Sequence, residues 1–219
     1  MSKTDKSGDS RVAVTPQLGA WTGSFGDAYV DRNEYAYWKM EPGTKAFRRI
    51  IGGLDIKSVL EVGSSIGFNL LFINELFKGN LKLYAVEPNR KAFDTLVSET
   101  PMRLEKAWNC DAFQLPLADT SIDLVFTAGV LIHIAPDDLC RAMDEIVRVA
   151  RRYVLCIEYF SHEPVEVPYR NQMGLLFKRD FGAFYLDRFP SLKCVQYGFL
   201  WQREFKIFDN LTYWLFKKD

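Results

Sequence analysis

The sequence predicts an α/β fold in which helices cover both faces of a mostly parallel β-sheet. Between residues 57 and 158, short apolar segments alternate with helical segments of roughly ten residues. A glycine-bearing turn follows the first apolar segment, and two more apolar segments close the chain. Strands that alternate with helices in this way pair in parallel, because each helix carries the chain back across the sheet.

Local signals set the limits of the individual elements. Residues 44–53 predict a helix that ends at Gly52-Gly53, since glycine commonly follows a helix. Residues 136–150 predict a helix with Pro136 in its first turn and two aspartates near its positive end. The other expected helices are 68–77 and 89–98, and the expected parallel strands are 57–62, 81–86, 103–107, 122–127 and 153–158.

The C-terminal part of the chain has a different pattern. Residues 193–202 and 211–216 are apolar segments with no helix expected between them. Two strands joined by a loop form an antiparallel pair most simply, here at the sheet edge. The sequence therefore predicts a seven-stranded, mostly parallel sheet whose last strand is antiparallel.

Composition limits the classes of protein and partner. The chain has 28 basic and 28 acidic residues, so its formal net charge is zero, which argues against a nucleic-acid partner. No apolar segment is long enough to span a membrane, and the polar start MSKTDKSGDSR does not resemble a secretion signal. We expect a cytoplasmic protein with three parts: a flexible terminus over 1–20, an aromatic helical lid over 21–43 and the main domain over 44–219.

The cysteines do not indicate a metal site or disulfides. Cys110, Cys140, Cys156 and Cys194 are widely spaced and never form a C-x-x-C motif. Only two histidines are present, and neither is near a pair of cysteines. We expect four reduced thiols and no metal cofactor.

Four segments at the ends of successive strands indicate a ligand site. The first is Val59–Gly67, where Gly63 allows a sharp turn and Gly67 allows close approach of the backbone. It reads G-x-x-x-G, so it is not the dinucleotide fingerprint. The second is Glu87, directly after the second strand, where a carboxylate can accept hydrogen bonds from both hydroxyls of a ribose.

The third and fourth segments follow the next two strands. In Asn109–Phe113, the carboxylate of Asp111 can accept a hydrogen bond from an adenine amine, and Phe113 can cover the ring. In Thr127–Ile134, small residues leave room for the reactive end of a nucleoside cofactor. Each segment also has a plain structural explanation as a strand-to-helix turn.

Together the four segments resemble, in order and spacing, the class I S-adenosylmethionine (SAM) methyltransferases, over roughly residues 45–216. The resemblance implies a Rossmann-like methyltransferase fold, SAM as methyl donor and S-adenosylhomocysteine (SAH) as product. Where many relatives have a third glycine, this chain has Ser64-Ser65-Ile66. The implied cofactor residues are Glu61, Gly63, Ser64, Gly67, Glu87, Pro88, Asp111, Ala112, Phe113, Thr127, Ala128 and Gly129. Phe25 and Trp38 are also expected to contact the cofactor, because the aromatic lid can close over it.

By this resemblance the parts of the cofactor fall to different residues. Glu61 and Gly63 lie near its methionine half, and Glu87 binds the ribose. Asp111 and Phe113 hold the adenine.

A narrower resemblance covers nearly the whole chain from Trp21. The segments WTGSFGDAYVDRN, FTAGVLIHI, EYFSHEPVEVPYR, LFKRDF and LDRFPSLKCVQYGF resemble the methylases associated with pseudaminic acid biosynthesis, to which a phosphonate O-methyltransferase of dehydrophos biosynthesis is similar. The resemblance implies a small anionic acceptor, and the first candidate is a phosphonate of natural-product biosynthesis. A nonulosonic sugar or carboxylate of surface-glycan biosynthesis is the alternative.

The acceptor residues are expected in three places. Segment 161–182 carries Tyr169, Arg170, Lys178 and Arg179, which either clamp an anion or form a solvated charged surface. His133 either contacts the acceptor, as hydrogen-bond donor or base, or caps a helix. In the lid, Tyr29 reaches the acceptor and Arg32 adds positive charge, unless this segment only packs on the sheet. We expect His133 and Tyr29 to be the catalytic residues.

Two other functions are compatible with the fold. A tRNA or protein methyltransferase is disfavoured, because the chain has no basic extension and no N/D-P-P-Y motif. The other is a non-catalytic cofactor-binding subunit. The sequence leaves a monomer and a homodimer equally open.

Overall fold

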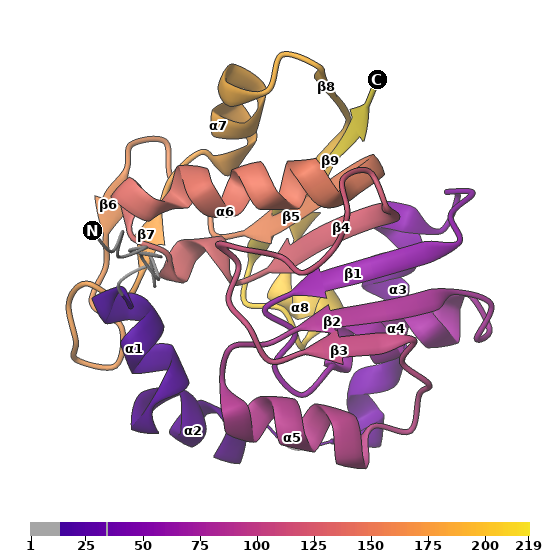
Figure 1. Ribbon diagram of the computed structural model, residues 1–219, viewed down its shortest axis with the longest axis horizontal. Helices are drawn as coiled ribbons and strands as arrows, with labels where there is room; N and C mark the ends of the chain where they lie inside the picture. The colour runs from indigo at the N-terminus through magenta and orange to yellow at the C-terminus, as the bar shows by residue number, and fades with distance from the viewer. Residues whose placement is uncertain (1–13, 34) are drawn as a thin grey trace, which may run out of the picture.

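The computed structural model describes residues 14–33 and 35–219. Its centre is a seven-stranded sheet with the order β3-β2-β1-β4-β5-β9-β8 (Figure 1). The strands are β1 (Ser58–Val62), β2 (Lys82–Val86), β3 (Lys106–Trp108), β4 (Ile122–Ala128), β5 (Ala150–Glu158), β8 (Leu192–Leu200) and β9 (Leu211–Lys218). The first five pair in parallel, whereas β9 pairs antiparallel with β5 and β8. The predicted fold class is therefore confirmed.

Two apolar cores sandwich this sheet. On one face, α3 (Met40–Ile51), α4 (Phe68–Leu76) and the short α8 (Gln202–Phe205) pack against alternate residues of the strands. On the other face, α6 (Pro136–Val149) and α7 (Phe181–Arg188) do the same. Strand β1 is buried throughout, as expected of a central parallel strand.

The expected elements occur with small shifts, and a few appear where none was expected. Helix α5 (Arg90–Glu99) begins after Asn89, whose side chain accepts a hydrogen bond from the amide of Ala92. The two-strand tail was predicted without a helix, but α8 lies between β8 and β9. Helix α7 and a small hairpin of β6 (Val165–Glu166) and β7 (Phe177–Lys178) were also not predicted. These elements have only two to eight residues, too few to show a clear periodicity.

The strand order places a crevice at the carboxyl ends of β1 and β4. Successive crossovers run from β1 to β2 and β3 in one direction, and then return to β4 beside β1. In open α/β sheets, ligands bind outside the carboxyl ends of the strands where this reversal occurs. The fold thus fixes the place of the site before any side chain is considered.

The N-terminal helices lie across this crevice. They are α1 (Pro16–Thr22) and α2 (Ser24–Asp31), followed by the short η1 (Tyr37–Lys39). Figure 1 shows α1 and α2 on the side of the molecule toward which β1, β2 and β4 point. Helix α1 begins five residues before the expected lid, because Pro16 occupies its first turn and Thr15 caps it. Most of the terminus expected to be flexible, residues 1–13, lies outside the described part of the chain.

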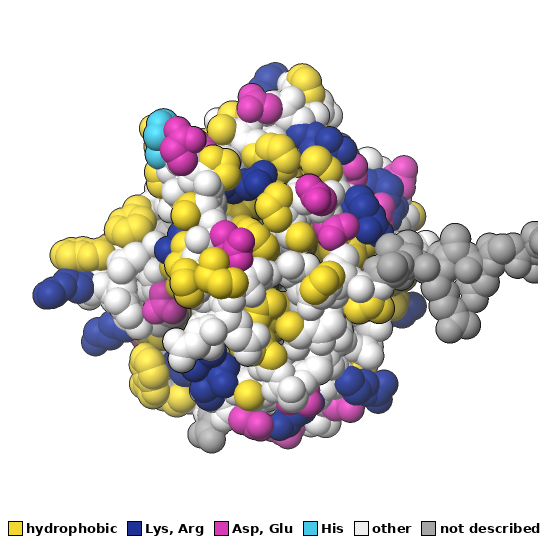
Figure 2. Space-filling view, turned by 90° about the vertical axis from the view of Figure 1, so that its left-hand side faces the viewer, with side chains coloured by type: hydrophobic (Ala, Val, Ile, Leu, Met, Phe, Trp, Pro, Cys, Tyr) yellow, Lys and Arg dark blue, Asp and Glu magenta, His cyan; other side chains and the backbone are white. Residues whose placement is uncertain are grey.

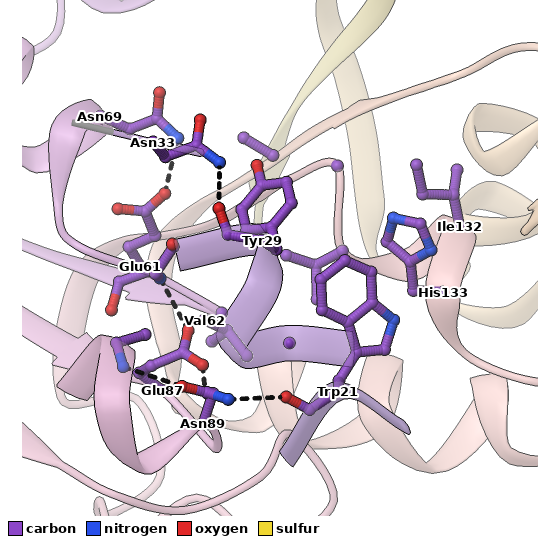
Figure 3. A pocket seen from close by; sticks show the side chains of 18 of the residues that line it. Trp21, Tyr29, Asn33, Glu61, Val62, Asn69, Glu87, Asn89, Ile132 and His133 are labelled. Atoms are coloured by element: carbon purple, nitrogen blue, oxygen red, sulfur yellow. Dashed lines mark hydrogen bonds between the residues drawn. The ribbon is translucent and has the colours of Figure 1, made fainter. Parts of the chain in front are cut away.

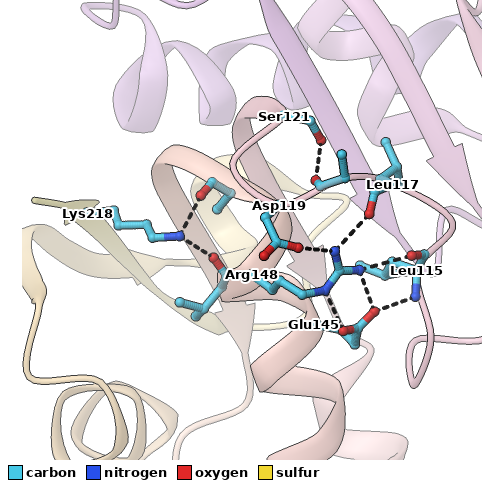
Figure 4. Close-up of polar contacts among 10 residues, drawn as sticks. Leu115, Leu117, Asp119, Ser121, Glu145, Arg148 and Lys218 are labelled. Atoms are coloured by element: carbon cyan, nitrogen blue, oxygen red, sulfur yellow. Dashed lines mark hydrogen bonds and ion pairs between the residues drawn. The ribbon is translucent and has the colours of Figure 1, made fainter.

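One arginine joins α6 to the loop that precedes β4 (Figure 4). The guanidinium of Arg148 donates to both carboxylate oxygens of Glu145, at 2.6 and 2.7 Å, and to Asp119 at 2.7 Å. It also donates to the carbonyl oxygens of Leu115 and Leu117, at 3.0 and 2.8 Å. Across residues 14–33 and 35–219, no helix has the length and apolarity needed to cross a lipid bilayer.

We expect Arg148→Ala to lower the free energy of unfolding by about 2–3 kcal/mol, because two carboxylates and two partly buried carbonyls lose their donor. Arg90→Ala is the matched control, since Arg90 forms one exposed i,i+4 pair with Asp94, worth about 0.5 kcal/mol or less. Urea unfolding measures both values. Equal losses of unfolding free energy in the two variants would show that the Arg148 contacts stabilise the fold no more than an ordinary surface ion pair does.

Candidate active site

A cavity of about 560 Å³ opens at the carboxyl ends of β1, β2 and β4. Its walls come from these strand ends, from α1 and α2, from Tyr159 and Tyr169, and from residues 206–209 before β9. A volume of this size is typical of a small-molecule site. Figure 3 shows two regions, with Glu61 and Glu87 on one side and Trp21 and His133 on the other.

The loop between β1 and α4 forms the floor of the cavity. Gly63 has a φ of 77°, and a Cβ there would lie 2.6 Å from a methyl carbon of Val130, so only glycine fits. The amides of Gly63 and Ser64 both donate to the carbonyl oxygen of Val86, at 2.8 and 3.0 Å. The hydroxyl of Tyr35 donates to the carbonyl oxygen of Ile66 on the other side of the loop. These contacts fix the loop against β2.

Glu61 contributes a buried carboxylate with one unused oxygen. Its Oε1 accepts a hydrogen bond from Asn69 at 2.7 Å. Its Oε2 is buried and has no hydrogen-bond partner in the described part of the chain. Burial raises the pKa of this carboxyl well above its usual range, and the bond from Asn69 only partly offsets that rise. A cationic donor, such as the ammonium of an amino acid, would satisfy the free oxygen.

Glu87 ends β2 beside the same loop. Its two oxygens accept hydrogen bonds from the amides of Ser65 and Asn89, at 2.7 and 2.8 Å. Burial raises its pKa to about 7, although both amide bonds lower it. Each oxygen keeps a free lone pair, so the carboxylate can also receive the hydroxyls of a ribose.

Asn89 joins this carboxylate to the lid. Its side-chain nitrogen donates to the carbonyl oxygen of Trp21 at 3.0 Å and to the carboxylate of Asp27 at 2.9 Å. Lys91, two residues further along the chain, forms an exposed ion pair with Asp31 of α2. At the opposite rim, Gln17 of α1 donates to the carbonyl oxygen of Gly174 at 2.9 Å. The lid therefore bridges the two sides of the cavity mouth.

His133 belongs to the short helix η2 (Leu131–His133), which a buried carboxylate holds in place. Glu158, at the end of β5, accepts hydrogen bonds from the amides of Val130, Leu131 and Ile132, at 3.2, 3.1 and 3.4 Å. The imidazole Nδ1 of His133 lies 2.6 Å from the carbonyl oxygen of Leu175 and therefore carries the proton. Burial lowers the pKa of His133 to about 4, so the ring is neutral at physiological pH.

Aromatic rings surround His133. The ring of Trp21 lies 4.5 Å from the imidazole and that of Tyr169 lies 5.2 Å away, measured between centroids. Tyr29 and Phe25 pack edge-on against Trp21, at 5.4 and 5.2 Å. Burial raises the pKa of Tyr29 to about 12, so its hydroxyl stays protonated and can donate.

The structure brings most of the expected residues together, although whether they bind a ligand stays a prediction. Tyr29, His133 and Tyr169 line the cavity, together with the expected cofactor residues Trp38, Glu61, Gly63, Ser64, Glu87, Pro88, Asp111, Ala112, Phe113, Ala128 and Gly129. Three expected cofactor residues lie outside its lining: Phe25, Gly67 and Thr127. Phe25 packs against Trp21 and Tyr169, and Thr127 is buried on β4. Gly67 leaves room for Leu96, since a Cβ there would come within 2.5 Å of that side chain.

The four expected acceptor cations do not line the cavity either, but three of them lie behind tyrosines that do. Arg170 is exposed at the tip of a two-residue turn, where Tyr169 and Gln172 exchange backbone hydrogen bonds. Its guanidinium lies 5.9 Å from the ring of Tyr169, and the Lys178 ammonium lies 4.7 Å from that of Tyr159. Arg32 lies 5.9 Å from the ring of Tyr29. Arg179 lies over Phe184, away from the cavity.

Several lining residues were not predicted as site residues. Asn69 lies two residues after Gly67, in the first turn of α4, and contacts Glu61. Trp21 and Asn89 belong to segments that were recognised, but their own roles depend on tertiary contacts. The segment Lys206–Asp209 reaches the cavity from between α8 and β9, and nothing in its sequence indicates this position.

The surface around the lid and the β6–β7 hairpin is mixed in charge. Figure 2 shows this side of the molecule, with lysine and arginine side chains scattered among acidic and hydrophobic ones rather than gathered into one stripe. This face lacks the continuous basic surface that binding of a polyphosphate chain requires. The described residues also contain no group of three or more metal-binding side chains.

The residues of the cavity fit SAM. The unpartnered oxygen of Glu61 suits its ammonium group, and the glycine turn at Gly63 leaves room beside it for the methionine chain. Glu87 suits the ribose. Asp111 accepts a hydrogen bond from the amide of Phe113 at 2.8 Å, which fixes its carboxylate at the cavity wall, where it would suit an adenine amine.

Comparisons with known proteins agree with this assignment. Residues 60–157 match a family model described as a methyltransferase domain. The chain is a SAM-dependent methyltransferase. Among curated protein sequences, none matches the chain significantly.

Solved structures share the fold of this methyltransferase at low identity. The Burkholderia thailandensis 1,6-didemethyltoxoflavin-N1-methyltransferase with bound SAH has 16% identity, a TM-score of 0.68 and coverage of 92% of this chain and 86% of that one. The Synechocystis PCC 6803 magnesium protoporphyrin IX methyltransferase with bound SAM has 11% identity, a TM-score of 0.64 and coverage of 95% and 99%. A chain from the complex of the Haloferax volcanii Trm112 activator with a methyltransferase has 14% identity and a TM-score of 0.67, with coverage of 88% of this chain and 95% of that one. At these identities the likeness concerns the fold alone.

We predict that the affinity of the methyltransferase for SAH rises as the pH increases through about 7. Glu87 must be ionised to accept two ribose hydroxyls fully, and its pKa of about 7 means that it is half protonated there. The affinity should rise by up to about tenfold between pH 6 and 8. Calorimetry measures it, and Glu87→Gln should remove most of the dependence. A flat profile for the wild type would contradict the role of Glu87.

We also predict that Asn89→Asp loosens the lid. The aspartate keeps the acceptor that caps α5, but it loses the donors to Trp21 and Asp27 and places a second carboxylate beside Asp27. Amide hydrogen exchange over 16–31 should become faster by about tenfold or more. Lys91→Ala, which removes only an exposed pair to α2, should change it far less. Unchanged exchange in Asn89→Asp would show that other contacts hold the lid.

Proposed function

We propose that this methyltransferase transfers a methyl group from SAM to an oxygen of a small anionic molecule, with phosphonates as the first candidates. The observation that carries the proposal is the arrangement of Tyr29, Tyr159 and Tyr169 around the end of the cavity next to His133, each with a cation behind its ring. Bound SAM supplies the activated methyl group. The chain supplies position, hydrogen bonds and exclusion of water.

The tyrosines suit an anionic acceptor because their hydroxyls are neutral hydrogen-bond donors. Burial raises the pKa of Tyr29 and of Tyr159 to about 12, so both hydroxyls donate at physiological pH. A hydroxyl donor holds an oxygen without fully neutralising it, and a cation behind the ring adds longer-range attraction. The resemblance to the methylases of pseudaminic acid biosynthesis and to a phosphonate O-methyltransferase supports the same class of acceptor.

A nonulosonic sugar or another carboxylate is the second candidate. The polar groups at this end of the cavity include His133 and Asp209, which can accept hydrogen bonds from sugar hydroxyls. A tRNA or protein acceptor fits less well, because the site lies beneath a lid that bridges both rims. The mixed charge of the face that carries the lid also argues against a tRNA acceptor.

An acceptor screen tests the proposal. The purified chain is incubated with SAM and with phosphonates, sugar acids and simple carboxylates, and mass spectrometry detects the added methyl group. We expect transfer to at least one anionic small molecule and none to tRNA or protein. Transfer to a macromolecule alone, or SAM binding without transfer to any of the small molecules, would overturn it.

The cations behind the tyrosines give a second test. Arg170→Ala and Lys178→Ala should each raise KM for the anionic acceptor by roughly threefold to tenfold, because each removes a nearby charge worth about 1 kcal/mol. Binding of SAH should stay unchanged. Arg179→Ala is the matched control, since Arg179 lies over Phe184 outside the cavity. If all three variants raised KM equally, general surface charge rather than the ring of tyrosines would explain the effect.

A further inference from the structure

Trp21 carries an unused hydrogen-bond donor inside the cavity. Its ring nitrogen Nε1 is buried, and no acceptor lies within hydrogen-bonding distance among the residues that the structure describes. A buried donor without a partner destabilises a folded protein by about 1–3 kcal/mol. Trp21 lines the cavity, so a ligand in the cavity can supply the missing acceptor.

His133 presents the complementary group beside it. Its Nδ1 proton is used by the carbonyl oxygen of Leu175, which leaves Nε2 as a hydrogen-bond acceptor. The two ring centroids are 4.5 Å apart, and Figure 3 shows the two side chains next to each other at the edge of the cavity. Glu158 and Leu175 hold η2 and the imidazole from two sides, so this tautomer is built into the fold.

Trp21 offers a hydrogen-bond donor and His133 offers an acceptor beside it. The ligand group that suits both is one that can accept and donate a hydrogen bond, such as a hydroxyl. We propose that Trp21 and His133 together bind a hydroxyl of the substrate, and that this neutral hydroxyl, rather than an ionised phosphonate or carboxylate oxygen, receives the methyl group. The proposal rests on the proposed function, since it specifies which oxygen of the anionic molecule reacts. The hydroxyl accepts from Trp21 Nε1 and donates to His133 Nε2.

An ionised oxygen fits this pair poorly. It can accept from Trp21, but it has no proton for His133, so its lone pairs would face those of Nε2. Protonating His133 would remove the conflict, but burial of the imidazole opposes that change. The anionic group of the same molecule fits the tyrosines instead, where Tyr29 and Tyr169 offer donors close to Trp21.

The reaction balances with the groups present. The hydroxyl oxygen attacks the methyl carbon, a carbon–oxygen bond forms and the carbon–sulfur bond breaks. The sulfur keeps the electron pair of the broken bond and leaves as a neutral thioether. The hydroxyl proton becomes strongly acidic as the new bond forms, so even a weakly basic imidazole can take it at Nε2 and later release it to water.

Binding measurements test the pair without turnover. SAH-loaded protein is titrated with hydroxymethylphosphonate and with methylphosphonate, which differ by one hydroxyl. We expect the wild type to bind the hydroxylated compound about tenfold more tightly. Trp21→Phe keeps an aromatic ring but removes the donor, so it should reduce this preference to about threefold or less. Trp201→Phe, at an exposed tryptophan outside the cavity lining, should keep it.

The position of the new methyl group is the second readout. SAM with a labelled methyl group is supplied with hydroxymethylphosphonate and with glycolate, and NMR shows whether the label lies on the hydroxyl or on the anionic oxygen. We expect the hydroxyl, and we expect His133→Gln to lower kcat by about a hundredfold with little change in the binding of SAH. Methylation of the anionic oxygen, or equal binding of the two phosphonates by the wild type, would overturn the inference. Failure of the proposed function looks different, because the acceptor screen then yields no methylated small molecule at all.

Discussion

The geometry of the site depends on three buried carboxylates, each near the carboxyl end of a strand. Glu61 lies on β1, Glu87 directly follows β2 and Glu158 ends β5, and all three are less than a tenth exposed. Burying a carboxylate is costly unless donors surround it. Glu87 and Glu158 receive theirs from backbone amides, and each thereby fixes one loop of the cavity.

The same arrangement separates structural from functional carboxylates. The amides of Val130 and of two η2 residues occupy Glu158, so this carboxylate holds the segment that carries His133. Glu87 has one amide on each oxygen, which leaves capacity for a ligand. Glu61 accepts a hydrogen bond from only one side chain, that of Asn69, and has an unpartnered oxygen, so it is the least satisfied of the three. We therefore expect the ionisation of Glu61 and Glu87 to be coupled to cofactor binding, and that of Glu158 not to be.

The central part of the fold was predictable because its signals are local. Strands such as β4 are apolar along their length, and α6 has a proline at its start and aspartates in its first turn. The positions of Glu61, Glu87 and Asp111 follow from those strands, since parallel strands end at one edge of the sheet. The same rule places His133 near the cavity, since it follows β4.

The rest was not predictable, because it depends on contacts between distant segments. Gly67 looks like a ligand-contact glycine, but it serves the approach of Leu96. The tautomer of His133 is set by Leu175, which is 42 positions further along the chain. Arg170 looks like part of a clamp, yet a tight turn points it outward. Trp21 has no sequence signal of its own, because a missing partner is visible only in three dimensions.

The distance of the cations from the cavity has a chemical consequence. A guanidinium in contact with the reacting oxygen would lower its nucleophilicity, because a strong charge-assisted hydrogen bond stabilises the lone pair that must attack. Because they lie within 6 Å of the rings of Tyr29, Tyr159 and Tyr169 but outside the cavity lining, the cations would attract an anion from several ångströms away without touching it. The hydroxyl donors and the His133 acceptor at this end of the cavity are neutral groups, which would orient the substrate and leave its oxygen free to react, although Lys206 and Asp209 also line the cavity. Binding and reactivity are thus assigned to different layers of side chains.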